Sequence, residues 1–204
     1  MESLNILIKS IFIDNMVFAY FFGMCSYIAV SKSVKTANGL GLAVIFVMAV
    51  TVPLNWLLNE YVLKAGALEW ASSSLGGIDL SFLSFIIFIA VIASFVQLVE
   101  MVVEKFAPGL YNQLGIFLPL IAVNCAIMGA SLFMQERAYP DLGQATSFGV
   151  GSGIGWWLAI VMMAAIRERI EYSAIPAPLK GPGITFIITG LMGMAFMSFL
   201  GIQL

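Results

Sequence analysis

The stretch FFGMCSYIAV, residues 21–30, places a cysteine in a sequence that is otherwise apolar enough to lie in lipid. LIAVNCAIMG, residues 120–129, does the same, and Cys25 and Cys125 are the two cysteines of the 204-residue chain. The whole chain is 61% hydrophobic and 10% charged, whereas a soluble domain draws roughly a quarter of its residues from Asp, Glu, Lys and Arg. This composition predicts an integral membrane protein in a lipid bilayer.

Two other classes of sequence fit poorly. The net charge of −2 is spread over short loops, so there is no basic surface of the kind that binds nucleic acid. The first apolar run follows Glu2 and Lys9 rather than a basic segment, and no small-residue cleavage site comes after it. We therefore expect no removable signal peptide.

Six apolar runs are long enough for helices that cross the membrane. A helix needs about 20 apolar residues to cross roughly 30 Å of hydrocarbon, and the runs are continuous rather than alternating, which favours helices over a β-barrel. The spans are expected near Ser10–Ser31, Gly39–Val62, Leu80–Val103, Gly115–Met134, Phe148–Ile166 and Gly183–Leu200. The predicted fold is an all-α membrane protein that forms a single domain over residues 1–204.

The basic residues of the loops predict the orientation, because Lys and Arg close to span ends are retained in the cytoplasm. Six of them fall on one face and three on the other: Lys32, Lys35, Lys105, Arg167, Arg169 and Lys180 against Lys9, Lys64 and Arg137. With six spans, both termini lie on the side that has fewer basic residues. We therefore expect both termini outside the cytoplasm.

The two halves of the chain, 1–104 and 105–204, resemble each other. The cysteines are 100 positions apart, SFIIF at 84–88 matches TFIIT at 185–189, and GLGLAVIFVMA at 39–49 resembles GIGWWLAIVMM at 153–163. Each half would contain three spans, and because three is odd, the second half would enter the membrane inverted relative to the first. Chance similarity between apolar segments is the alternative. The inverted repeat predicts that Cys25 and Cys125 meet near mid-membrane.

The residues leave three roles open for the cysteines: small buried apolar side chains, a disulfide, or thiolate ligands of a soft metal centre. Helix-disturbing residues precede both, namely Gly23 before Cys25 and Pro119 and Asn124 before Cys125. Proline and glycine favour broken helices, which at membrane depth usually line a site or cavity. We therefore predict breaks in the first and fourth spans.

The number of available ligands limits what one chain can hold. A thiolate-bound iron or iron–sulfur centre normally has four protein ligands, and this chain has two cysteines and no histidine. If a centre exists, two of its ligands must come from another chain.

Three further features have structural as well as functional interpretations. GVGSGIGWW, residues 149–157, lacks the spacing of a nucleotide-binding loop, and its glycine pairs indicate close helix packing. Glu100 and Glu104, one turn apart in the third span, suit either a cation path or a hydrated interface. The tryptophans are expected mostly at the membrane interfaces: Trp56, Trp70, Trp156 and Trp157.

Four stretches resemble a known family. They are DNMVFAYFFGMCSYIAVSKSVKTANGLGLA (14–43), LYNQLGIFLPLIAVNCAIMG (110–129), GSGIGWWLAIV (151–161) and AAIRERIEYSAIPAPLKGPGITFIITGLM (164–192). They are similar to the E-subunit family of the sodium-translocating NADH:quinone oxidoreductases, whose paralogues are the D subunit of that complex and the A and E subunits of the Rnf complex. The likeness covers nearly the whole chain.

The resemblance implies a component of a six-subunit translocase, without catalytic activity of its own. It implies that Cys25 and Cys125 hold an iron or [2Fe–2S] centre with two cysteines of the paralogous D subunit. It also implies electron transfer across the membrane, from an iron–sulfur and flavin-bearing subunit on the cytoplasmic side to a covalent-flavin subunit outside, coupled to Na⁺ export. The flavins and the quinone are expected on other subunits.

Three alternatives remain open from the sequence. A subunit of the Rnf-type ferredoxin:NAD⁺ oxidoreductase would have a similar sequence. A secondary transporter would suit an inverted repeat, and a purely structural subunit would carry its thiols as bystanders.

Overall fold

The computed structural model describes residues 2–64, 81–106, 118–173, 176, 179 and 181–201. Within these residues all regular structure is helical, as predicted. Three helical segments are long and apolar enough to cross a membrane, namely Val34–Leu63, Ser84–Val102 and Leu142–Ile170. Leu120–Glu136 and Pro182–Met197 are shorter apolar helical segments.

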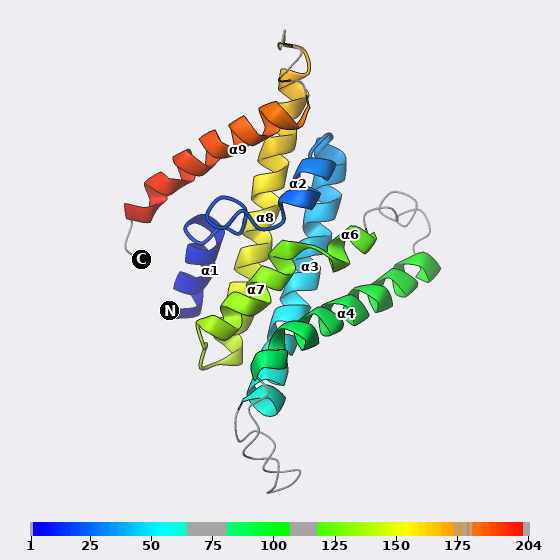
Figure 1. Ribbon diagram of the computed structural model, residues 1–204, viewed down its shortest axis with the longest axis vertical. Coiled ribbons are helices and arrows are strands. Elements are labelled where there is room, and N and C mark those ends of the chain that lie inside the picture. Colours follow the sequence, from blue (N-terminus) through cyan, green and yellow to red (C-terminus); the bar gives the residue numbers. More distant parts are fainter. Residues whose placement is uncertain are drawn as a thin grey trace, which may run out of the picture.

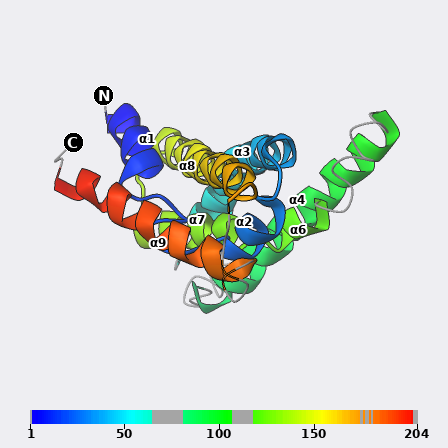
Figure 2. The same cartoon turned by 90° about the horizontal axis from the view of Figure 1, so that it is seen from above.

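The two longest helices lie side by side along the long axis of the molecule (Figures 1 and 2). They are α3 (Val34–Leu58), which continues as a π-helical segment over Asn59–Leu63, and α8 (Leu142–Ile170). Helix α1 (Glu2–Phe12) and helix α7 (Cys125–Glu136) pack beside this pair. The long helices therefore form the centre of the fold.

Two helices diverge from the central pair on opposite sides, α4 (Ser84–Phe106) and α9 (Pro182–Met197) (Figure 2). A 3₁₀ turn over Ser81–Leu83 precedes α4, and another over Ser198–Gly201 follows α9. Both carry large exposed apolar side chains, among them Phe85 and Ile86 on α4 and Leu191 and Met194 on α9. Exposed apolar faces of this kind suit contact with lipid or with other membrane helices.

Glycines allow the central helices to approach closely, as the sequence predicts. A Cβ added to Gly149 or Gly153 would lie 2.9 Å from Val52 Cβ or Ile45 Cα on α3. A Cβ added to Gly151 would lie 2.8 Å from the Leu7 carbonyl oxygen on α1, and Gly155 faces the same helix. Because lipid gives no hydrophobic drive for helix association, this close packing stabilises the bundle.

The first predicted span begins too late in the chain. The sequence suggests a start at Ser10, whereas α1 runs from Glu2 to Phe12. The Ser10 hydroxyl donates to the Ile6 carbonyl oxygen at 2.7 Å, so Ser10 lies inside a helix rather than capping one. The predicted breaks, by contrast, are present: residues 13–23 separate α1 from α2 (Met24–Val30), and Val123 and Asn124 separate α6 (Leu118–Ala122) from α7.

The helix-packing glycines lead to a prediction about stability. Gly153→Ala should lower the free energy of unfolding by about 1–3 kcal/mol, because the new methyl group meets the backbone of α3. Gly190→Ala on α9 is the matched control, since a Cβ there has nothing within 4 Å. Thermal unfolding in detergent measures both. Equal midpoints for the two variants would contradict the packing described here.

Candidate cysteine site

A single asparagine organises the break between α1 and α2. Asn15 is fully buried, and its side-chain Nδ2 donates to the carbonyl oxygens of Ile11 at 3.0 Å and Gly155 at 2.9 Å. Its Oδ1 accepts from the backbone N–H of Val17 at 3.0 Å and, more weakly, of Phe18 at 3.3 Å. Asn15 therefore satisfies the backbone where α1 ends and fixes the non-helical segment to α8.

Gly23 directly precedes α2, and a glycine is required there for two reasons. Its φ of 79° lies in the left-handed region, which side chains disfavour. A Cβ at this position would also lie 2.4 Å from Trp156 Nε1 and 2.9 Å from Asn124 Oδ1. Close packing at Gly23 thus places the first turn of α2, which contains Cys25, against the second helix break.

The second break places Cys125 in a similar way. Asn124 has an extended backbone, and its Oδ1 accepts the Ala126 N–H at 3.0 Å, which caps α7. Cys125 is the first residue of that helix. The break falls at Val123 and Asn124 rather than at Pro119, which lies within α6.

The two cysteines lie together, as the repeat predicts. The Cys25 and Cys125 thiols lie close enough to interact with each other, although the residues are 100 positions apart in the sequence. Both cysteines are free, and both are exposed at the surface of the chain. The disulfide and buried-hydrophobe interpretations therefore do not describe this structure.

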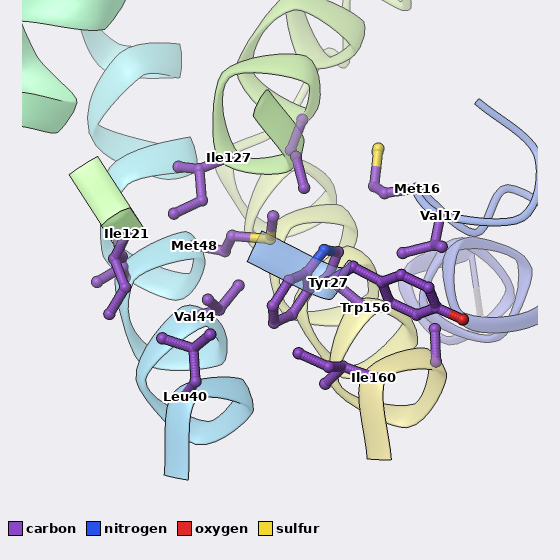
Figure 3. Packing of buried hydrophobic residues seen from close by; sticks show 14 of the residues in the cluster. Met16, Val17, Tyr27, Leu40, Val44, Met48, Ile121, Ile127, Trp156 and Ile160 are labelled. Carbon is purple, nitrogen blue, oxygen red and sulfur yellow. The ribbon is translucent and has the colours of Figure 1, made fainter. Parts of the chain in front are cut away.

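Figure 3 shows the core beside this site, in which the Trp156 indole lies among apolar side chains from several helices. Trp156 is fully buried inside the chain, so its ring does not face the lipid. Trp157, its neighbour, donates from Nε1 to Asn38 Oδ1 at 2.9 Å. Trp70 lies outside the described residues.

Two neighbouring side chains of α8 hold the connection from α2 to α3. The Arg167 Nη1 group donates to the Ile28 carbonyl oxygen at 2.9 Å and to Ser31 Oγ at 2.7 Å, at the C-terminal end of α2. Glu168 Oε1 accepts the Val34 N–H at 2.8 Å, at the start of α3. Each charge lies at the helix end that it stabilises, and together they fix the end of α2 opposite Cys25.

A second polar cluster joins the first break to the loop before α8. Arg137 Nη1 forms an ion pair with Asp14 Oδ2 at 2.8 Å, and its Nη2 donates to Tyr20 OH at 3.2 Å. The guanidinium group also lies over the rings of Phe133 and Phe148, at 5.8 and 5.2 Å from their centroids. This cluster ties residues 13–23 to the C-terminal end of α7.

The other candidate residues do not join the site. Glu100 is half-buried and Glu104 exposed on α4, a different helix from those that carry the cysteines. Gly115, where the fourth span is expected to begin, lies outside the described residues. In the part of the chain that the structure describes, no three His, Cys, Asp or Glu side chains form a metal-binding group. A metal centre at Cys25 and Cys125 would need further ligands.

Comparison with known proteins identifies the family. The family model described as "Rnf-Nqr subunit, membrane protein" matches residues 3–203. The chain belongs to this Rnf-Nqr family of membrane subunits.

Several relatives of this family member share one name. The E subunit of the Na⁺-translocating NADH-quinone reductase from Maridesulfovibrio salexigens is 58% identical over 98% of each chain. The proteins of the same name from Psychrobacter cryohalolentis and Rhodopirellula baltica are 57% and 54% identical, over 98% and 100% of this chain and 98% and 99% of theirs. The resemblance to the E-subunit family is thus confirmed, as is a location in a membrane.

Proposed function

We propose that this chain is the E subunit of a Na⁺-translocating NADH:quinone oxidoreductase and carries electrons across the membrane. In this proposal Cys25 and Cys125 hold an iron or [2Fe–2S] centre together with two cysteines of the paralogous D subunit. The observation that supports it most is the proximity of the two thiols, which lie at the broken starts of two helices and are both exposed.

The donor set suits a soft metal shared between chains. Thiolates are the ligands that iron–sulfur centres use, and two thiols provide half of the usual four. Both thiols lie at the surface, where a second chain can reach the same metal. The exposed side chains of Phe21 and Val123, just before the two cysteines, provide apolar surface for that chain to cover.

The residues of this chain would hold the centre in place. Gly23, Asn15 and Asn124 fix the two helix starts, and Arg167 fixes the far end of α2. When bound, the centre would accept electrons that come from NADH through the cytoplasmic subunits and donate them to the flavin on the opposite side. The apolar core behind the thiols keeps water away from the chain's side of the site.

The inverted repeat belongs to this proposal, with halves 1–104 and 105–204. It is supported by the breaks before the two cysteines, by the central pairing of α3 with α8, and by the divergence of α4 and α9 on opposite sides (Figure 2). The paralogous subunit would have the same architecture and pack against the exposed thiols. With six spans, both termini would lie on the periplasmic side of the inner membrane.

Metal analysis of the purified complex tests the proposal. Iron and acid-labile sulfide should fall by the content of one centre in Cys25→Ala and in Cys125→Ala, and the visible absorption of that centre should disappear. Ala29→Ser, on the exposed face of α2, is the matched control and should keep the parental iron content. Unchanged iron in both cysteine variants would overturn the proposal, and solute uptake by the isolated chain in liposomes would favour a transporter.

A further inference from the structure

Two buried N–H donors lie beside the helix starts that carry the cysteines, without an acceptor in the part of the chain that the structure describes. Trp156 is 0% exposed and Asn124 is 4% exposed, yet Trp156 Nε1 and Asn124 Nδ2 have no hydrogen-bond acceptor among the residues that the structure describes. A buried donor left unpaired costs about 1–3 kcal/mol, so most such donors in folded proteins have an acceptor. Their position therefore points to an acceptor that is not among the described residues.

Both donors belong to the junction that places the thiols. Trp156 Nε1 and Asn124 Oδ1, the oxygen of the amide that carries the second donor, each approach within 3 Å of one point, the position that a Cβ on Gly23 would occupy. Gly23 is two residues before Cys25, Asn124 directly precedes Cys125, and the two thiols lie near each other. The Asn124 oxygen already accepts the Ala126 N–H, which leaves the amide nitrogen free to donate.

We propose that Trp156 Nε1 and Asn124 Nδ2 donate hydrogen bonds to the sulfur atoms of the centre held at Cys25 and Cys125 and thereby set its reduction potential. This inference rests on the proposed function. Reduction adds negative charge to the sulfurs, so an N–H donor stabilises the reduced centre more than the oxidised one. Both side chains therefore raise the potential. Trp156 and Asn124 are positioning and tuning residues here, and Cys25 and Cys125 remain the ligands.

The structure offers a matched pair of tryptophans for the test. Trp156→Phe removes the unpartnered donor, whereas Trp157→Phe removes a donor that already bonds to Asn38 on α3. In the purified complex, a redox titration should show that Trp156→Phe lowers the reduction potential of the centre by about 59 mV for one electron. This shift corresponds to about a tenfold change in the equilibrium constant for reduction. Trp157→Phe should keep the parental potential, and iron should be retained in both.

Two further variants separate hydrogen bonding from shape. Replacing Trp156 by 3-benzothienyl-alanine keeps the shape of the indole and removes its N–H, so the potential should fall as in Trp156→Phe. Asn124→Ser keeps a side-chain oxygen to cap α7 and removes the amide donor, with the same expected direction. Resonance Raman spectra in deuterated buffer give a second measure, because hydrogen bonds to sulfur shift the iron–sulfur bands. That shift should shrink in the three donor-deleted variants.

The outcomes distinguish the inference from the function on which it rests. If iron is retained and the potential of Trp156→Phe equals that of Trp157→Phe, the inference is overturned and the function stands. If Trp156→Phe lowers the potential but the benzothienyl variant does not, Trp156 acts by shape alone and the inference is likewise overturned. If no iron in the parental complex depends on Cys25 or Cys125, both fail. A buried water as the acceptor would leave potential and Raman shift unchanged, which also overturns the inference.

Discussion

Quinone reduction by the assembled complex should be lost when either Cys25 or Cys125 is replaced by serine. Loss of a residue that hydrogen-bonds to a metal ligand typically costs about 10–100-fold in metal affinity or activity. Loss of a ligand itself should therefore lower the rate of quinone reduction by at least about 100-fold. Serine has nearly the size of cysteine, so packing at the two exposed positions is kept, but its hydroxyl replaces the thiolate that iron–sulfur centres use. The rate of NADH-driven quinone reduction in proteoliposomes is the measurement.

The site of the block can be localised in the same preparation. Reduction of a soluble acceptor by NADH at the cytoplasmic subunits should persist in both variants, because those subunits precede this chain in the proposed path. Ala29→Ser should reduce quinone at the parental rate. Parental quinone reduction in either cysteine variant would contradict the electron-carrier role.

Gly23→Ala should cause the second large loss. The left-handed backbone costs a non-glycine residue about 1–2 kcal/mol, and the overpacking against Trp156 and Asn124 adds about 1–3 kcal/mol. Because both costs fall where α2 meets the break before α7, the thiols should separate and the complex should lose the iron that depends on them. The measurements are iron content and the thermal midpoint of the purified complex.

Gly181→Ala provides the control for backbone strain alone. Gly181 also has a positive φ, of 101°, but a Cβ there meets no described atom within 4 Å. This variant should lose a little stability and keep its iron. Equal iron content in Gly23→Ala and Gly181→Ala would mean that close packing at Gly23 does not position the cysteines.

Much of the fold follows from the sequence because lipid imposes strong rules. Continuous apolar runs predict helices, and α3, α4 and α8 lie where such runs occur. Glycines at a spacing of four predict close contacts, which Gly149 and Gly153 make with α3. The ends of helices are harder to predict, because they can depend on distant residues. At the start of α3, the Val34 N–H donates to the carboxylate of Glu168, more than a hundred residues away in the sequence.

The candidate site was partly predictable for the same reason. The repeat predicted that Cys25 and Cys125 would meet, and they do. The repeat does not indicate that Trp156 lies beside the site. From the sequence, a tryptophan near a predicted span end is expected at the membrane interface, and only the packing shows that Trp156 is buried. Arg167 was likewise counted only as a cytoplasmic charge, although it also caps α2. Contacts between distant segments carry no local signal in one sequence.

The central claim is that Cys25 and Cys125 are two of four sulfur ligands to iron. It is tested most directly by X-ray absorption at the iron edge, as the difference between the parental complex and the Cys25→Ser, Cys125→Ser double variant. The proposal predicts that the iron lost from the variant has a first shell of sulfur alone, with about four sulfurs per iron. A difference spectrum without iron, or one with a nitrogen and oxygen first shell, would contradict it.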